Sequence, residues 1–311
     1  MSSILVTGGA GFIGSHLAHR LVTLGHDVRV IDNFLSGKRA NLAPILDSID
    51  LLEGDLRSPE DCASACRGVD AVLHLAARPS VPMSVEDPRL SHDINVNGTF
   101  NLLVAARDAG VRRVVYAASS SAYGESGLGV KTESQLPAPL SPYAANKLVG
   151  EYYMRVFYES YGLQTLSLRY FNVFGPRQDP KSQYAAAIPA FVTSILEGRA
   201  PTIYGDGEQT RDFTFIENVI HANLLAIEAE ATHGEVLNIA CGERISVNQV
   251  IADINAALGT SVAPNHVAER AGDIKHSLAN IELAREVLGY APSVDFQEGL
   301  RRTIAWYQDN A

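Results

Sequence analysis

Short apolar runs alternate with longer amphipathic stretches through the first half of the chain. The runs span residues 4–6, 28–31, 49–53, 71–75, 114–118 and 165–169. They are too continuously apolar for exposed strands, which is typical of strands buried in a parallel sheet. Helical periodicity between them, clearest over 93–109 and 143–161, predicts connecting helices. We therefore expect an α/β fold, a Rossmann-type doubly wound parallel sheet with helices on both faces.

The pattern changes after Arg169. Turns and long loops rich in Pro and Gly are expected up to Phe213. Helical patterns return over 216–229, 247–258 and 281–288, and the apolar run 236–239 is expected to rejoin the main sheet. The expected division is a first domain over 1–171, with a return segment around 212–240, and a smaller C-terminal α/β lobe over 172–311. This lobe would close over the strand ends and bind the substrate.

A glycine-rich turn follows the first strand. Gly8, Gly11 and Gly14 lie in this turn, and the second strand ends in Asp32. In such a βαβ unit the glycines let the backbone approach a pyrophosphate, which the helix N-terminus attracts. The Asp32 carboxylate can accept from both ribose hydroxyls and would repel a 2′-phosphate, so NAD is the expected cofactor. Lys38 and Arg39 lie close enough to keep NADP as the alternative.

Polar side chains also follow the later strands. Tyr143 and Lys147 open a predicted helix four residues apart, on one helical face. A lysine ammonium there stabilises the phenolate, so Tyr143 can act as a general base near neutral pH. An exposed pair on a solvated helix is the alternative. Ser119 and its neighbours end the fifth strand, and Asp55 could either bind an adenine amino group or cap the next helix.

Composition narrows the class of protein. Hydrophobic residues make up 46% and charged residues 19%, as in an ordinary globular enzyme. The net charge of −10 has no basic block, which argues against a nucleic-acid partner. Cys62, Cys66 and Cys241 have no histidine cluster around them, so no metal site is expected. No apolar run is long enough to cross a membrane, and no signal peptide is visible, so a cytoplasmic location is expected.

These motifs together resemble the extended short-chain dehydrogenase/reductase family, and within it the UDP-hexose 4-epimerases, over essentially the whole chain. The motifs are Gly8/Gly11/Gly14, Asp32-Asn33, Gly54-Asp55-Leu56, His74-Leu75-Ala76-Ala77, Asn95-Val96-Asn97-Gly98-Thr99, Ser119-Ser120-Ser121-Ala122-Tyr123-Gly124, Tyr143-x-x-x-Lys147, Arg169-Tyr170-Phe171-Asn172 and Gly205-Asp206-Gly207 before Arg211-Asp212-Phe213. The resemblance implies tightly held NAD and a UDP-sugar substrate. It also implies Tyr143 as general base and acid, Lys147 as its activator, and Ser119 as partner of the C4 hydroxyl, with Ser120 and Ser121 as alternatives.

The resemblance further implies which residues contact the two ligands. The cofactor set is Gly8, Gly11, Phe12, Ile13, Gly14, Asp32, Asn33, Gly37, Asp55, Leu56, Leu75, Ala76, Ala77, Asn95, Tyr143, Lys147 and Phe171, the last near the nicotinamide. The substrate set is Ser80, Ser119, Ser120, Asn172, Ala186, Ala187, Arg211, Arg270 and Ser277. Within it, Arg211 and Arg270 are expected at the diphosphate and the backbone of Ala186 and Ala187 at the uracil. Arg177 is expected to serve the structure of the lobe.

The serine run separates the chemistries of this family. Dehydratases of the family use a Thr-Asp-Glu run at the end of the fifth strand, where gapless counting places Ser119-Ser120-Ser121. Elimination of water needs a further acid–base group, which three hydroxyls do not supply. A 4-keto sugar formed here can only take its hydride back on the opposite face. We therefore expect epimerisation at C4.

The segment from Asn172 to Pro189 and the sequence Gly272-Asp273-Ile274-Lys275-His276-Ser277 resemble epimerases of N-acetylated UDP-hexosamines, the UDP-N-acetylglucosamine 4-epimerases. The resemblance implies that a large aromatic residue at the Ser277 position shuts out an N-acetyl group in other members of the family, whereas serine leaves room for it. The expected pair is UDP-N-acetylglucosamine and UDP-N-acetylgalactosamine, with UDP-glucose and UDP-galactose also accepted. The alternatives are a UDP-glucose 4-epimerase, a UDP-glucuronate 4-epimerase and a catalytically idle NAD-binding regulator.

The predicted helices 93–109 and 143–161 carry apolar residues around more than one face. Tyr152, Tyr153, Phe157 and Tyr158 exceed what one buried stripe needs. A homodimer through a four-helix bundle of these helices is therefore expected.

Overall fold

The computed structural model describes residues 2–124, 129–180, 187–269 and 275–310. A seven-stranded sheet of order β11-β6-β5-β4-β1-β2-β3 forms its centre, and all its neighbouring strands are parallel. The strands are β1 (Ser3–Thr7), β2 (Asp27–Asp32), β3 (Ile49–Glu53), β4 (Ala71–His74), β5 (Arg113–Ser119), β6 (Gln164–Tyr170) and β11 (Glu235–Ile239). The chain builds outward from β1 to β3 and then from β4 to β6 on the other side, which confirms the expected doubly wound sheet.

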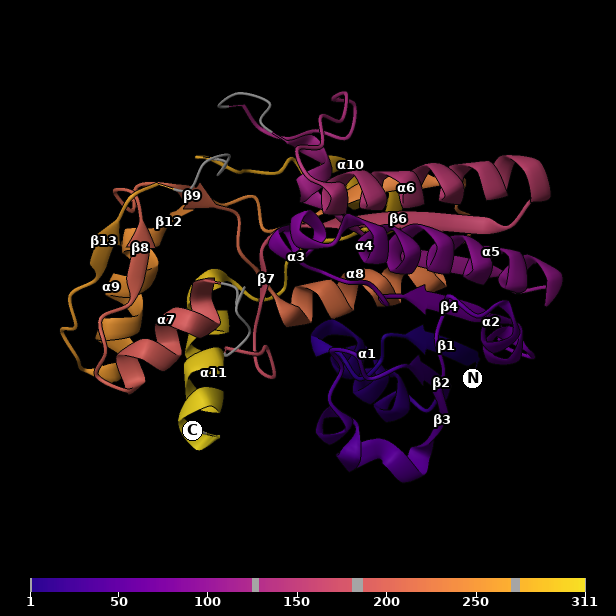
Figure 1. Ribbon diagram of the computed structural model, residues 1–311, viewed down its shortest axis with the longest axis horizontal. Coiled ribbons are helices and arrows are strands. Elements are labelled where there is room, and N and C mark those ends of the chain that lie inside the picture. The colour runs from indigo at the N-terminus through magenta and orange to yellow at the C-terminus, as the bar shows by residue number, and fades with distance from the viewer. Residues whose placement is uncertain (1, 125–128, 181–186, 270–274, 311) are drawn as a thin grey trace.

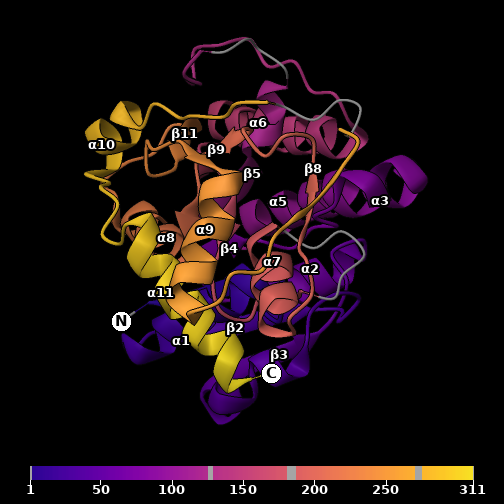
Figure 2. The same ribbon diagram turned by 90° about the vertical axis from the view of Figure 1, so that its left-hand side faces the viewer.

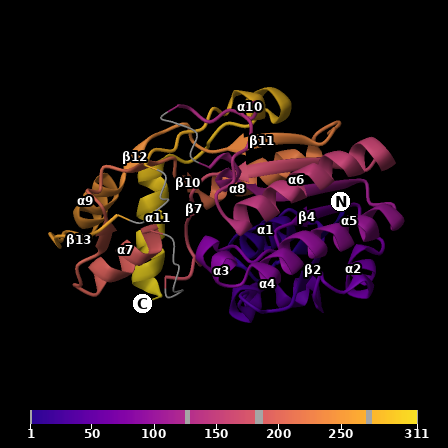
Figure 3. The ribbon, with the colours of Figure 1, turned by 45° about the horizontal axis from the view of Figure 1, so that its top comes forward.

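Helices cover both faces of the sheet, as Figures 1 and 3 show. One face packs on α1 (Phe12–Thr23) and α8 (Ile216–Glu228), the other on α2 (Pro59–Cys66), α5 (Gly98–Asp108) and α6 (Pro142–Tyr161). Side chains alternate between faces along a strand, so Ile4 and Val6 join the first core and Leu5 the second. Burial on both faces explains the continuous apolar runs of the sequence.

The expected return of the chain to the sheet is found in β11, which pairs in parallel with β6. Helix α10 (Glu282–Leu288) packs on β11. Because β11 and the preceding α8 belong to the sheet layers, we propose the domain division at residue 171 with the return segment around 212–240.

The rest of the chain forms a smaller C-terminal lobe beyond the carboxyl ends of the strands (Figures 1 and 2). Its helices are α7 (Ala187–Leu196), α9 (Val247–Leu258) and α11 (Phe296–Asp309). Its strands pair as β8 (Thr202–Tyr204) with β13 (Asn265–Val267), β9 (Thr210–Arg211) with β12 (Ile245–Ser246), and β7 (Val173–Phe174) with β10 (Thr214–Phe215). The expectation of loops throughout 170–213 was wrong at α7, whose apolar face packs on α9 and α11. Pro189 is tolerated because it lies in the first turn of α7.

The expected helix 93–109 is also irregular. Two short helices, α3 (Val81–Glu86) and α4 (Pro88–His92), precede it, and Asp93–Asn97 forms a π-helical turn before α5 begins. Such turns are rare and often lie at functional sites. Here the turn brings Asn95 against the backbone of Arg78, beyond the end of β4.

Candidate active site

A cavity of about 1230 Å³ lies at the carboxyl ends of the strands, with residues of the C-terminal lobe on its other wall. This volume exceeds the roughly 300–1,000 Å³ of an ordinary small-ligand pocket and leaves room for a cofactor and a substrate together. The predicted site residues on its wall are Gly8, Gly11, Phe12, Ile13, Gly14, Asp32, Asn33, Gly37, Asp55, Leu56, Leu75, Ala76, Ala77, Ser119, Ser120, Tyr143, Lys147, Asn172, Arg211 and Ser277.

The turn after β1 is built so closely that only glycine fits. Gly8 has a φ of +65°, and a Cβ there would lie 2.8 Å from the backbone of Ala76. A Cβ on Gly14 would lie 2.3 Å from the carbonyl oxygen of Gly8. The start of α1 is thereby held against the ends of β1 and β4 and faces the cavity. This cradle fits the pyrophosphate of a dinucleotide, which the helix dipole attracts.

The Asp32 carboxylate is fixed at the end of β2. One oxygen accepts from the Ala10 N–H at 2.9 Å and the other from the Phe34 N–H at 2.8 Å. Phe34 has the rare φ of 57°, so the chain turns sharply directly after Asp32-Asn33. Burial raises the pKa of Asp32, and the two backbone hydrogen bonds oppose that rise. The carboxylate is therefore held in place on the wall where a ribose of the cofactor would lie.

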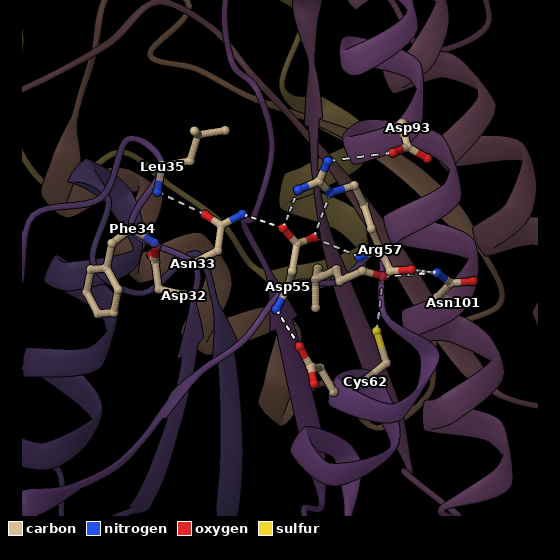
Figure 4. A network of polar contacts seen from close by, with 11 residues as sticks. Asp32, Asn33, Phe34, Leu35, Asp55, Arg57, Cys62, Asp93 and Asn101 are labelled. Carbon is tan, nitrogen blue, oxygen red and sulfur yellow. Dashed lines mark hydrogen bonds and ion pairs between the residues drawn. The ribbon is translucent and has the colours of Figure 1, made fainter.

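Asp55 belongs to a polar network that joins the ends of β2 and β3 (Figure 4). Its carboxylate accepts from Asn33 at 2.8 Å and from Arg57 Nη2 at 2.8 Å. Hydrogen bonding by the Arg57 side chain is the main reason why the pKa of Asp55 falls to about 2. Ser58 caps α2, since its hydroxyl accepts from the Asp61 N–H at 3.1 Å. The alternative that Asp55 caps this helix was therefore wrong, and its expected contact with adenine stays a prediction.

Tyr143 and Lys147 are positioned by the start of α6. Ser141 caps this helix by accepting from the Ala144 N–H at 3.2 Å. The Tyr143 N–H donates to the Ser84 hydroxyl at 3.0 Å. One turn further on, Lys147 Nζ donates to the Ala117 carbonyl oxygen of β5 at 2.9 Å. Both side chains reach the cavity wall, as their spacing predicts.

The serine run turns sharply after β5. Ser119 Oγ accepts from both the N–H and the hydroxyl of Ser121, at 3.2 and 2.9 Å. The Ser119 side chain lies close enough to Tyr143, the predicted base, to lower the pKa of its phenol. Ser119, Ser120 and Ser121 all line the cavity, and the choice of Ser119 among them stays a prediction.

The pKa values of Tyr143 and Lys147 differ from the sequence-based expectation. Burial raises the pKa of Tyr143, and the nearby Ser119 side chain opposes that rise. Burial lowers the pKa of Lys147 to about 7, and the Glu151 carboxylate opposes that fall. The Lys147 ammonium points at β5, where it also lies 4.8 Å from the Tyr116 ring centroid. We expected Lys147 to lower the pKa of Tyr143, but in the protein without ligands the pKa of Tyr143 is raised.

The substrate end of the cavity is formed by Asn172, Arg211 and Ser277. Asn172 has a φ of 32°, and its side chain donates to the Asp212 carbonyl oxygen at 3.1 Å. Arg211 Nη1 donates to the carbonyl oxygens of Thr210 and Lys275, at 2.9 and 3.2 Å. The Ser277 N–H donates to the same Thr210 carbonyl at 3.1 Å. Arg211 and Ser277 therefore lie side by side on the cavity wall.

Several predicted contacts lie away from this wall. Phe171 is fully buried against Tyr123, so the expected nicotinamide contact is corrected to a core position. Asn95 is buried behind the wall, where it accepts from the Arg78 N–H at 2.8 Å. Ser80 caps α3, and Ala187 begins α7. The predictions for Ala186 and Arg270 fall outside the described residues.

The cavity also has wall residues that sequence reasoning missed. Arg177, expected to serve only the structure of the lobe, lines the cavity with a φ of 66°. Lys38 and Asp179 form an ion pair of 2.9 Å between the loop after β2 and the lobe. Residues far apart in the sequence meet here, so no local pattern could have found them.

Among the described residues, no helix is long and apolar enough to cross a membrane. The same part of the chain contains no group of three or more His, Cys, Asp or Glu side chains that could hold a metal ion.

Comparison with known proteins agrees with this geometry. Residues 4–240 match the NAD dependent epimerase/dehydratase family. A putative UDP-glucose 4-epimerase of Methanocaldococcus jannaschii is 38% identical over 309 residues, which covers 99% of both chains. Among solved structures, a UDP-N-acetylglucosamine 4-epimerase from Methanobrevibacter ruminantium M1, in complex with UDP-N-acetylmuramic acid, superposes with a TM-score of 0.95 at 40% identity. That match covers 100% of this chain and 99% of the other.

A UDP-glucose 4-epimerase of Thermus thermophilus in complex with NAD superposes with a TM-score of 0.91 at 36% identity, covering 99% of this chain and 100% of that one. The similar proteins and the glycine turn at the start of α1 both indicate a protein that binds NAD. This chain belongs to the NAD-dependent epimerase/dehydratase family, among its UDP-sugar 4-epimerases.

Proposed function

We propose that the protein interconverts UDP-N-acetylglucosamine and UDP-N-acetylgalactosamine and also accepts UDP-glucose and UDP-galactose. The observation that carries the proposal is the position of Ser277. Its small side chain lies on the cavity wall beside Arg211, where it leaves volume for an acetamide group. The similarity to a UDP-N-acetylglucosamine 4-epimerase over the whole chain supports the same substrate.

The residues on the wall suit NAD as the hydride carrier. The glycine turn would hold the pyrophosphate, Asp32 a ribose, and Lys147 the ribose of the nicotinamide. NAD held by these residues would supply the hydride acceptor for C4 of the sugar and the donor for the return step. The positive charge of the oxidised nicotinamide would lower the pKa of a phenol beside it, which makes up for the high pKa of Tyr143 in the chain alone.

Proton transfer falls to Tyr143 and Ser119, which lie together on the cavity wall. Tyr143 Oη takes the proton of the C4 hydroxyl as the 4-keto sugar forms, with Ser119 Oγ bonded to the same sugar oxygen. Arg211 binds the diphosphate while the sugar turns over. The hydride would then be added to the opposite face of C4 while Tyr143 returns the proton to the C4 oxygen. The serine run contains no carboxylate for elimination of water, so the keto sugar is reduced again and leaves as the C4 epimer.

The test is a product assay with the purified enzyme. Each UDP-sugar is incubated separately, and the products are resolved by anion-exchange chromatography and NMR. We expect a mixture of UDP-N-acetylglucosamine and UDP-N-acetylgalactosamine whichever of the two is supplied. Product only from UDP-glucose or only from UDP-glucuronate would favour those alternative epimerases. No epimer from any sugar, with NAD bound, would favour the idle regulator.

The Ser277→Tyr variant tests whether the small side chain at position 277 admits the N-acetyl group, which we call the gate. We expect it to lose turnover of the N-acetylated pair by roughly tenfold or more while retaining UDP-glucose turnover, because an added ring fills the space of the acetamide. Ser64→Tyr, an exposed substitution on α2, is the matched control. Equal turnover of the N-acetylated pair by wild type and Ser277→Tyr would contradict the gate.

The homodimer is proposed on the surface of α5 and α6. Phe100 on α5 and Tyr152, Val156 and Tyr161 on α6 are large apolar or aromatic side chains that the single chain leaves exposed. Burying them in a four-helix bundle would remove apolar surface from water. Light scattering should give a dimer, and Val156→Glu should give a monomer of unchanged fold. A wild-type monomer at micromolar concentration would overturn this proposal. The cytoplasmic location stays a prediction.

A further inference from the structure

The catalytic face of α6 continues one turn beyond Lys147. Tyr143, Lys147 and Glu151 recur at four-residue spacing, so they lie on one helical face. Glu151 is 3% exposed and binds Arg169 of β6 through both carboxylate oxygens, at 2.8 and 2.7 Å. Arg169 is equally buried, with its guanidinium carbon 4.5 Å from the Tyr123 ring centroid. A bidentate ion pair therefore lies directly behind the catalytic pair.

A buried ion pair such as Glu151–Arg169 contributes little to the free energy of folding. Removing two charges from water costs several kcal/mol per ion, and apolar residues of similar volume often stabilise a core equally well. One guanidinium nitrogen of Arg169, Nη1, is buried without a hydrogen-bond partner among the described residues, which adds to that cost. The Glu151–Arg169 pair therefore calls for a role beyond packing.

The surroundings of Lys147 indicate that role. Its ammonium is buried, and around it lie the Ala117 carbonyl oxygen and the Tyr116 ring of β5. Glu151 is the carboxylate that acts on it. The groups that the other packed elements present toward α6 are His74 from β4, Tyr123 after β5, Arg169 from β6, Ser84 from α3, Ser91 from α4, Asn95 from the π-helical turn and Phe100 from α5.

Among these described neighbours, Arg169 is the cation, and its charge is engaged by Glu151. His74 is uncharged at neutral pH, because burial lowers its pKa to about 3. A buried ammonium without a nearby negative charge loses its proton readily.

We propose that Glu151 is a positioning residue for the reaction: its carboxylate, fixed by Arg169, keeps the Lys147 ammonium charged one helical turn away. Burial raises the pKa of Glu151, and Arg169 opposes that rise and turns the carboxylate toward the sheet. Without Glu151, a larger share of Lys147 would be neutral at a given pH, and its positive charge would be lost from the site. This proposal rests on the epimerase function proposed above for Tyr143 and Lys147.

The test compares wild type with three variants of the NAD-bound enzyme. Glu151→Gln removes the charge, Glu151→Asp keeps it, and the double variant Glu151→Gln/Arg169→Met removes the ion pair as a unit. The last variant guards against loss of the fold, because it leaves no unpaired charge in the core. The measurement is the pH profile of the first hydride transfer, followed in a single turnover by the absorbance of reduced nicotinamide.

We expect the alkaline limb of the profile to move down by about one pH unit in Glu151→Gln. It should move less, in the same direction, in the double variant, and return toward wild type in Glu151→Asp. A purely structural role predicts lower rates and stability with an unchanged profile, restored by the double variant, and that result would overturn the proposal. No hydride transfer by the wild type with any UDP-sugar would instead overturn the proposed function.

Discussion

Gly14 shows at the scale of one residue how closely the cofactor cradle is built. It lies in the first turn of α1, where an added Cβ would meet the carbonyl oxygen of Gly8 at 2.3 Å and the Gly9 Cα at 2.8 Å. Both contacts are with backbone, so a larger residue must move the turn itself. The same backbone forms the wall on which the pyrophosphate would lie.

We therefore expect Gly14→Ala to lower the free energy of unfolding by about 1–3 kcal/mol. It should also weaken NAD binding by about tenfold, equivalent to about 1.4 kcal/mol. Thermal unfolding and calorimetric titration measure the two effects. Gly129→Ala is the control, because a Cβ there meets nothing within 4 Å. Unchanged NAD affinity in Gly14→Ala would show that the cradle does not hold the cofactor.

The position of a residue in the sequence does not always predict whether its side chain reaches the cavity. The sequence predicts Tyr143, Lys147 and Asp32 on the cavity wall because each follows a strand end or lies on a known helical face. Phe171 follows a strand end too, yet it packs in the core. Its ring packs on Tyr123, a residue of another part of the chain that no spacing rule places there.

At the scale of elements, the N-terminus of α6 decides where Tyr143 and Lys147, the proposed catalytic pair, lie. Ser141 accepts the Ala144 N–H, and Pro142 begins the helix. An N-cap of this kind contributes about 1 kcal/mol. The cap also fixes the direction in which α6 leaves the strand ends, and with it the positions of Tyr143 and Lys147.

Ser141→Ala should therefore lower both the free energy of unfolding, by about 1 kcal/mol, and kcat. Asp295→Ala is the matched control, since Asp295 caps α11 by accepting the Glu298 N–H at 2.8 Å but does not line the cavity. It should lower stability alone. Chemical denaturation and steady-state kinetics are the measurements. Equal kcat values for both variants would show that the cap does not position the base.

The sequence predicted the buried strands of the central sheet more accurately than the elements of the C-terminal lobe. The strands buried on two faces, such as β4 at Ala71–His74, match the predicted runs closely. Helix α7 was missed, because Thr193 and Ser194 are the polar residues among its ten, too few to reveal a helical period, and because the segment lies among turn residues. Its helical form depends on packing against α9 and α11.

For the whole molecule, His74 links three parts of the fold. It is fully buried at the end of β4, with Nδ1 2.8 Å from the Thr7 hydroxyl of β1 and Nε2 2.9 Å from the Thr99 hydroxyl of α5. Burial lowers its pKa from 6.5 to about 3. The unfolded chain therefore binds one more proton than the folded chain between these values, so acid favours unfolding.

We expect the free energy of unfolding to fall as the pH drops from 6.5 toward 3, and His74→Gln to show a shallower fall. The variant should be less stable than wild type at neutral pH, where both imidazole contacts are lost. Urea unfolding across this interval measures the slopes, with the exposed His233→Gln as control. Parallel curves for wild type and His74→Gln would refute the role of this histidine.

The sequence alone determined the sheet, the glycine cradle, Asp32, the Tyr143–Lys147 face and the absence of a carboxylate in Ser119-Ser120-Ser121. These features depend on local periodicity and backbone geometry, which neighbouring residues set. Only the tertiary structure decided which side chains face the cavity, as for Arg177, and which charges surround the base, as for Glu151 and Arg169. Burial and the field of distant charges depend on segments that meet only after folding, and these set the protonation of Lys147.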